Sequence, residues 1–146
     1  MIFKKGRMPH SYIINFLGIR IRFRNKFACY NNKVVLVDEN GNQKNKNFKG
    51  LKVKFLGRNS TVKIYAPCPK FENCVFVCGD NVNISIGSSK HRISNLYVDL
   101  LSENGRLNIG TNLALRGGVF SIKEKEGLSV NIGNECLIAS NVKLWT

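Results

Sequence analysis

Hydrophobic and polar residues alternate in a short phrase that returns along the second half of the chain. The phrase consists of an aliphatic residue, a polar residue, isoleucine and glycine, and it occurs at 84–87, 107–110 and 130–133. Its copies are 23 residues apart, and residues 62–64 fit the same phrase 22 residues earlier. A fixed period of this length is typical of repeat architectures, in which each repeat is one structural unit.

A second set of positions keeps the same period and indicates what each repeat builds. One column holds only residues that tolerate the left-handed backbone region, which marks a corner: Gly50, Asn73, Asn95, Gly118 and Asn141. The column after the corner is apolar, and the column two residues further on is mostly apolar. These columns read Leu51, Cys74, Leu96, Val119, Val142 and Val53, Phe76, Val98, Ser121, Leu144. Alternation with period 2 predicts a short strand with one inward face and argues against a helical repeat.

Stacked repeats of this kind predict an all-β fold, a parallel β-solenoid in which each coil covers its neighbour. Near the C-terminus, aliphatic residues begin six-residue units at Ile132, Ile138 and Leu144, and residues 109–120 show a similar spacing. Three such units account for about 18 residues, so a coil of 22 or 23 residues must bulge at one corner. The polar, turn-rich segments 102–105 and 124–127 are placed for these bulges.

The six-residue units resemble those of the hexapeptide-repeat acyltransferases. The phrase from Ile132 to Leu144 is similar to the coil that precedes the active site in the sugar O-acetyltransferases of that family. The resemblance covers residues 48–146, and most of it lies in 84–87, 107–120 and 130–144. It implies a left-handed parallel β-helix, a homotrimer, and transfer of an acetyl group from acetyl-CoA to a sugar hydroxyl in bacterial surface polysaccharide biosynthesis.

Catalytic residues are assigned by this resemblance alone. In the family, a histidine acts as general base and a backbone N–H stabilises the oxyanion. The chain has two histidines: His10 in the N-terminal segment, and His91 in a polar stretch of the third coil, which is the one weak candidate base. The family's base is expected beyond Thr146. We therefore expect the chain to be the N-terminal part of a longer enzyme, inactive by itself, with an open last coil prone to end-to-end association.

Charge divides the 146 residues into a basic N-terminal part and a nearly neutral body. The net charge is +14, and residues 1–64 hold 15 Lys/Arg against two Asp/Glu. Segment 19–24 alternates apolar and cationic residues, which predicts a strand with one apolar and one basic face. We interpret residues 1–47 as a basic cap, with a strand and turn at 34–42, and residues 48–146 as the β-helix domain.

Three functions stay open at this point. The first is acyl transfer to a sugar or glycan acceptor. The second is a non-catalytic β-solenoid that serves as a scaffold or polymerising module. The third is binding of a polyanion, either an anionic membrane surface or a polyanionic glycan, through the basic N-terminal third. Nucleic acid is the weakest of these partners, because no helix-turn-helix, zinc or RNA-recognition signature accompanies the basic residues.

The cysteines indicate the redox environment. Five are present and cannot all pair, and neither an export signal nor an apolar run of membrane-spanning length accompanies them. We therefore expect reduced thiols in a cytoplasmic protein, one that could sit at the inner face of the membrane. The spacing of Cys68, Cys74 and Cys78 matches none of the usual zinc patterns, so we expect no metal site. The other two are Cys29 and Cys136.

Overall fold

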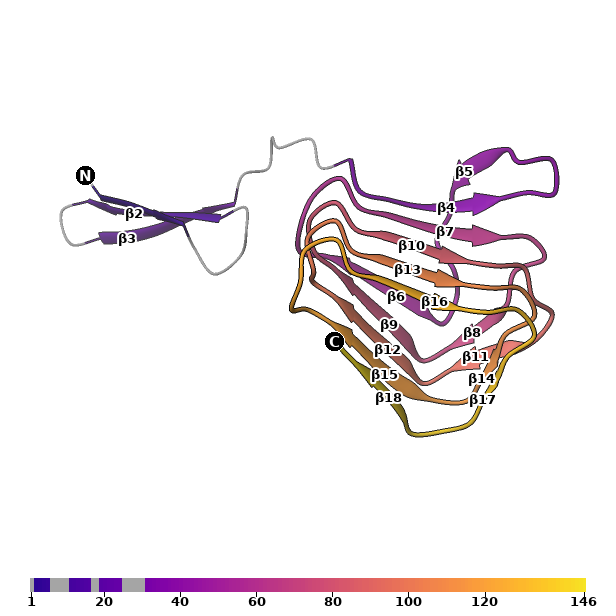
Figure 1. Cartoon of the computed structure of the whole chain (residues 1–146). Helices are drawn as coiled ribbons and strands as arrows, with labels where there is room; N and C mark the ends of the chain where they lie inside the picture. The colour runs from indigo at the N-terminus through magenta and orange to yellow at the C-terminus, as the bar shows by residue number, and fades with distance from the viewer. Residues whose placement is uncertain (1, 6–10, 17–18, 25–30) are drawn as a thin grey trace. The chain divides into compact units, whose positions relative to one another are not determined.

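The chain divides into two compact units, Met1–Asn31 and Asn32–Thr146. The computed structural model is drawn in Figure 1. It describes residues 2–5, 11–16, 19–24 and 31–146. Among these residues, no helix is long and apolar enough to cross a membrane.

The first unit contains a small antiparallel sheet. Its three strands pair in chain order, with β2 in the middle. The alternating segment 19–24, predicted as a strand, is the third of them, so this prediction is confirmed. The strands are β1 (Ile2–Lys5), β2 (Ser11–Phe16) and β3 (Ile19–Arg24).

The second unit is a parallel β-solenoid built from three sheets, which confirms the predicted fold class (Figure 1). Each parallel strand pairs with the equivalent strands of the neighbouring coils, and four complete three-strand coils follow an incomplete first one. The first sheet contains β4 (Lys33–Val37), β7 (Thr61–Tyr65), β10 (Asn83–Ile86), β13 (Arg106–Ile109) and β16 (Ser129–Ile132), with β5 (Gln43–Asn45) antiparallel on β4. The second contains β8 (Lys70–Glu72), β11 (Arg92–Ser94), β14 (Ala114–Leu115) and β17 (Leu137–Ile138). The third contains β6 (Leu51–Phe55), β9 (Cys74–Cys78), β12 (Leu96–Leu100), β15 (Gly118–Ile122) and β18 (Val142–Trp145).

The core consists of apolar columns that run along the inside of the coils. Register partners in the three sheets place equivalent side chains above one another, and the members in the middle coils are buried. The member from the last coil is only partly buried in each column, because no further coil covers it in this structure. The columns are Ile64, Ile86, Ile109, Ile132; Phe71, Ile93, Leu115, Ile138; and Phe76, Val98, Phe120, Leu144.

The predicted columns are wrong by one residue in the fourth coil. Leu96 pairs with Gly118 rather than with Val119, and Val119 instead pairs with Tyr97 on the outward face of the sheet. Phe120 consequently takes the inward position that the sequence analysis gave to Ser121, and it is 1 % exposed. The physical reason is that two glycines stand together at residues 117–118. Either glycine can form the corner, which allows two registers, one with Ser121 inward and one with Phe120 inward. The second register is adopted because it buries the phenyl ring of Phe120.

Asparagines form the corners of the coils. Asn73, Asn95 and Asn141 have positive φ angles of 53°, 51° and 65°, which confirms them as corner residues in the left-handed region. Gly117, not Gly118, takes the equivalent position in the fourth coil. Asn73 and Asn95 are also joined across coils, since Asn73 Nδ2 donates to Asn95 Oδ1 at 2.9 Å. These side-chain bonds add to the backbone ladder between neighbouring coils.

A second asparagine corner escaped the sequence analysis. Asn59, Asn81 and Asn104 have φ angles of 57°, 54° and 57°, and they follow the third-sheet strands of successive coils. The predicted bulges at 102–105 and 124–127 belong to this corner and are turns, as expected. They are joined to each other, because Asn104 Nδ2 donates to Glu126 Oε1 at 2.8 Å.

One predicted boundary and part of the predicted spacing differ from the structure. The strand expected in the cap, 34–37, is part of β4, and β4 pairs in parallel with β7, so the solenoid includes residues before 48. The six-residue spacing of inward residues holds in the last coil, at Ile132, Ile138 and Leu144. In the fourth coil it holds from Ile109 to Leu115, but the next inward residue is Phe120, and the second and third coils use other spacings because their corners differ in length.

Candidate functional site

Positive charge is concentrated on the first coil and the start of the second coil of the solenoid. Residues 32–70 carry nine Lys/Arg and two Asp/Glu, whereas residues 71–146 carry seven of each. On β6, Lys52 and Lys54 are exposed, while the residues between and beside them pack against the core. An anionic partner would therefore meet its strongest attraction at this end of the solenoid.

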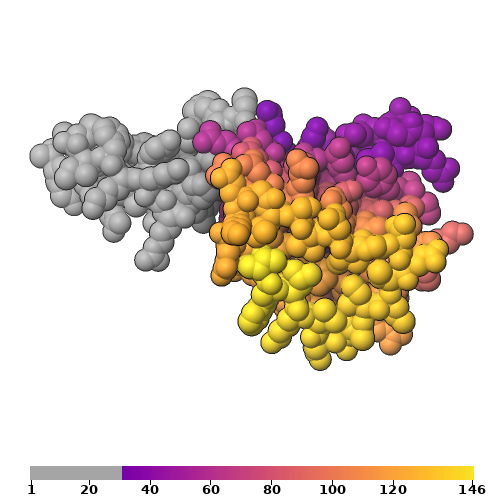
Figure 2. Space-filling model, viewed as in Figure 1, coloured from indigo at the N-terminus to yellow at the C-terminus, as the bar shows by residue number. Residues whose placement is uncertain are grey.

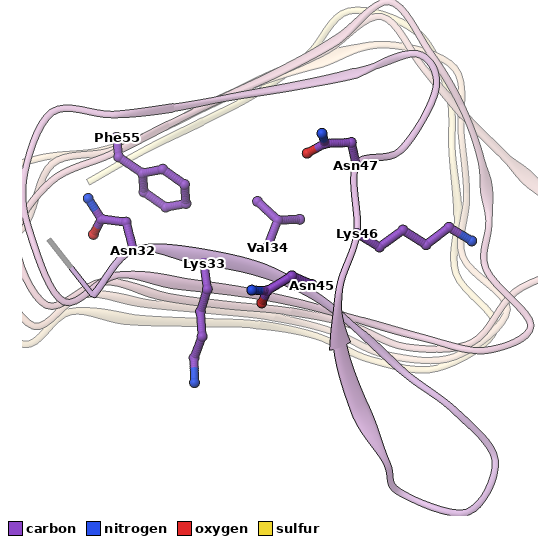
Figure 3. Close-up of a pocket in the computed structure, with 7 residues that line it drawn as sticks. All are labelled: Asn32, Lys33, Val34, Asn45, Lys46, Asn47 and Phe55. Atoms are coloured by element: carbon purple, nitrogen blue, oxygen red, sulfur yellow. The ribbon is translucent and has the colours of Figure 1, made fainter.

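A cavity of about 350 Å³ opens at the mouth of the first coil. Figure 3 shows that Phe55 and Val34 point into it, whereas the Lys33 and Lys46 side chains point away from its centre. Asn32 is fixed at its edge, because its Nδ2 donates to the Gly57 carbonyl at 2.8 Å and its Oδ1 accepts from the Ser60 N–H at 2.9 Å. The mouth is therefore an apolar opening with amide groups at the edge and lysines outside.

A second cavity, of about 690 Å³, lies beside this mouth, and we call it the lysine groove. Its aromatic part is formed by Phe48 and Phe71, whose ring centroids are 6.0 Å apart in an edge-to-face arrangement. The ammonium group of Lys46 lies 5.3 Å from the centroid of the Phe48 ring. The groove is lined by Lys46, Asn47, Phe48, Lys49, Gly50, Pro69, Lys70, Phe71, Glu72 and Asn73.

His91, the candidate base, lies between two further cavities on the second sheet. They have volumes of about 570 and 490 Å³, and His91 lines both. Its side chain is exposed, and its backbone is held in place. The His91 N–H donates to Ser89 Oγ at 3.0 Å, and its carbonyl accepts from the Lys70 N–H at 3.1 Å. The other candidate, His10, lies outside the described residues.

The larger of these cavities, which we call the His91 groove, crosses several coils. Arg92 and Arg116 line it, together with the strongly exposed Leu137. Arg92 forms an exposed ion pair with Glu72 at 2.9 Å, whereas Arg116 has no ion pair among the described residues. The imidazole of His91 likewise has no hydrogen bond to a carboxylate in this part of the chain, so nothing here orients it as a carboxylate orients a catalytic histidine.

The cysteines of the solenoid are free thiols, of which Cys74 and Cys78 are buried and Cys68 and Cys136 are partly exposed. Burial raises the pKa of Cys78 to about 12, and it also raises the pKa of Cys74. At Cys68 burial again raises the pKa, although the nearby Lys46 charge acts in the opposite direction. Within the described ranges, no three His, Cys, Asp or Glu side chains are grouped so that they could hold a metal ion. Cys29 lies outside these ranges.

The last coil forms an open end. β16, β17 and β18 are the terminal strands of their sheets, so one edge of each has no strand partner in the described structure. Leu137 and Trp145 are 79 % and 72 % exposed. The ammonium group of Lys143 lies 5.8 Å from the Trp145 ring centroid. In Figure 2 this coil, coloured yellow, covers a broad face of the solenoid.

No family model, no curated protein and no solved structure matches the chain. The resemblance to hexapeptide-repeat acyltransferases therefore stays an interpretation of the residues themselves. The solenoid fold is common to the scaffold and enzyme hypotheses, so the choice between them depends on the sites.

Sequence reasoning found the basic segment but missed the lysine groove. Lys46 and Lys70 are 24 positions apart in the sequence, and they line one cavity because the coil brings them together. The available signal was the excess of lysine before residue 70. It did not indicate which lysines share a cavity, since that depends on how the first coil closes.

Proposed function

We propose that the solenoid belongs to an acetyl-CoA-dependent O-acetyltransferase that modifies a sugar of a surface polysaccharide. The observation that carries this proposal is the His91 groove, which crosses several coils of the solenoid and is lined by both His91 and Arg116. The phrases at 84–87, 107–110 and 130–133, on which the resemblance rests, lie at equivalent positions of successive coils. A homotrimer with sites between neighbouring solenoids is the assembly that goes with this proposal.

The His91 groove is the part of this surface that best suits the acyl donor. The groove runs across coils, as an extended pantetheine arm requires, and Leu137 offers it apolar contact. Arg116 offers a cation for a phosphate group of the coenzyme. The groove's volume of about 570 Å³ lies in the range of small-molecule sites.

A base takes the proton of the sugar hydroxyl while its oxygen attacks the thioester carbonyl. The C–S bond then breaks, and the coenzyme leaves as a thiol after it receives the proton. Among the described residues, His91 is the side chain of the right type beside the proposed donor groove.

Calorimetric titration with acetyl-CoA tests this proposal. We expect saturable binding that weakens by about tenfold or more in Arg116→Glu, because a like charge then faces the coenzyme phosphates. Arg106→Glu is the matched control, since Arg106 is exposed on a different sheet and should leave binding nearly unchanged. Absence of saturable binding at millimolar acetyl-CoA, or equal loss in both variants, would contradict the proposal.

A second candidate function is that of a non-catalytic scaffold, and the surroundings of His91 favour it. Among the described residues, no carboxylate orients its exposed imidazole as a general base. Titration with acetyl-CoA and sedimentation velocity over a hundredfold range of protein concentration together distinguish the two functions. An enzyme binds the coenzyme and stops at one oligomeric size, whereas a scaffold does not bind it and forms larger species as the concentration rises.

A further inference from the structure

The lysine groove exists because the first coil lacks one strand. The first coil contributes β4 and β6 to two sheets, but the second sheet begins only with β8. Residues 46–50 cross this side instead, and they are anchored at their two ends. The Lys46 N–H donates to the Val34 carbonyl at 3.0 Å, and the Gly50 carbonyl accepts from the Cys74 N–H at 2.8 Å. Between these anchors, the described structure has no backbone hydrogen bonds from residues 47–49 to β8, which leaves the groove open.

Three exposed lysines surround this groove from both sides. Lys46 and Lys49 come from the crossing segment, and Lys70 comes from β8. The one carboxylate in the lining belongs to Glu72, and Arg92 pairs with it at 2.9 Å. Among the described residues no carboxylate pairs with these three lysines, so a ligand with several negative charges can contact all three at once.

The neutral lining narrows the class of ligand. Asn47 and Asn73 provide amide groups that bind hydroxyls. Phe48 and Phe71 contact each other edge to face at 73°, with Phe71 buried and Phe48 half-buried. Such a pair gives a small apolar patch but not the open aromatic platforms on which single-stranded nucleic acid stacks.

We propose that the lysine groove binds an acidic polysaccharide, with carboxylates of successive sugars on the lysines and sugar hydroxyls on the amides. Cationic groups, amides and a small apolar patch in one open groove match the three kinds of surface that a uronic acid chain presents. The proposal does not depend on acetyl transfer, because the groove is lined by residues of the first two coils and not by His91.

Calorimetric titration of the full chain with polygalacturonate oligomers, repeated at several salt concentrations, tests this proposal. The variant combines Lys46→Glu, Lys49→Glu and Lys70→Glu, and the matched control combines Arg106→Glu, Lys125→Glu and Lys143→Glu, which change the charge equally on other coils. We expect the groove variant to lose affinity at least about tenfold and to flatten the salt dependence. The control should lose less than about threefold.

Two further variants separate loss of the groove charges from misfolding and from binding by the N-terminal sheet. If circular dichroism shows that the groove variant is not folded, the three lysines are changed to glutamine instead, with the same expectation. Charge reversal of Arg20, Arg22 and Arg24 tests whether the N-terminal sheet holds the polymer. Equal losses in groove and control variants, or a larger loss in the arginine variant, would overturn the proposal. Tighter binding of a single-stranded oligonucleotide of equal charge would overturn it as well.

Discussion

The two ends of the solenoid are built from the same coil, yet they present different surfaces. At the N-terminal end, β5 pairs with part of β4, and the edge strand β6 exposes Lys52 and Lys54. At the C-terminal end, the edge strands β16, β17 and β18 have no such cover in the described structure. Charged side chains on an edge discourage pairing with another chain, whereas apolar ones favour it. The first coil therefore presents a charged edge, whereas the fifth coil of the described structure exposes the large apolar side chains Leu137 and Trp145.

This difference shows that a repeat does not by itself define the surface of a solenoid. The inward columns stay apolar from the second coil to the fifth, because every coil must cover its neighbour. The outward positions do not have to be apolar, so their charge can differ between coils. Residues 32–70 have an excess of positive charge, whereas residues 71–146 carry equal numbers of positive and negative side chains. Function is consequently to be sought where a coil departs from the repeat, as at the missing strand of the first coil.

The largest expected effect tests the continuous core that joins the two ends. Phe120→Asp places a carboxylate in a column that is 1 % exposed, and we expect it to cost several kcal/mol of the free energy of unfolding. Val119→Asp changes the neighbouring residue on the outward face, and we expect about 1 kcal/mol. Urea denaturation followed by circular dichroism measures both. If Val119→Asp lost more unfolding free energy than Phe120→Asp, the register with Val119 on the inward face would be the correct one.

The next effect compares a middle coil with the open end in one column. Ile86→Ala removes a buried side chain, and we expect a loss of about 2–5 kcal/mol. Ile132→Ala makes the same change in the last coil, where the side chain is only partly buried, and should cost less than half as much. Equal losses in urea titrations would mean that the last coil is covered in solution, which is the outcome expected if the chain associates through it.

A third effect acts on that association directly. Combining Leu137→Lys and Trp145→Lys places two charges on the open edges of β17 and β18, where Trp145 stands at the position equivalent to Lys54 of β6. We expect the dissociation constant for self-association to rise by about tenfold or more, with little change in unfolding of the monomer. Sedimentation velocity measures the first quantity, and the double variant Glu124→Lys, Glu126→Lys in an exposed turn is the control. An undiminished association would place the contact elsewhere.

The sequence was sufficient to predict the solenoid because its signals are local and repeated. Corner asparagines such as Asn73 and Asn95 and the alternation after them indicate strand and turn without knowledge of the rest of the chain. The register failed at Val119, where two adjacent glycines allow two corners, and only packing of Phe120 selects one. The columns alone are also compatible with either hand of winding, so the left-handed expectation rests on the resemblance.

The sites were less predictable than the fold, because they depend on irregularities of the coil. Charge counts located the basic region, but the lysine groove forms only because residues 46–50 replace a strand. The structure places the candidate base His91 on an exposed loop beside a groove. The repeated residue pattern does not predict that groove. A repeated residue pattern predicts structure that recurs in every coil, whereas the lysine groove and the His91 groove each occur once.

The smallest expected effect removes the protection of the N-terminal edge. Lys52→Thr and Lys54→Thr should change the free energy of unfolding by less than about 0.5 kcal/mol, because both side chains are exposed and threonine suits a strand. The same double variant should nevertheless self-associate more strongly, since β6 then offers an uncharged edge that can pair with β18 of another copy in parallel. Sedimentation velocity at low and at high salt measures this gain in self-association.

The control is Lys33→Thr, which changes an exposed lysine on β4 instead of β6. If self-association of the β6 variant is unchanged, then Lys52 and Lys54 do not protect this edge from pairing. The irregular crossing at 46–50 is then the remaining obstacle to a second copy.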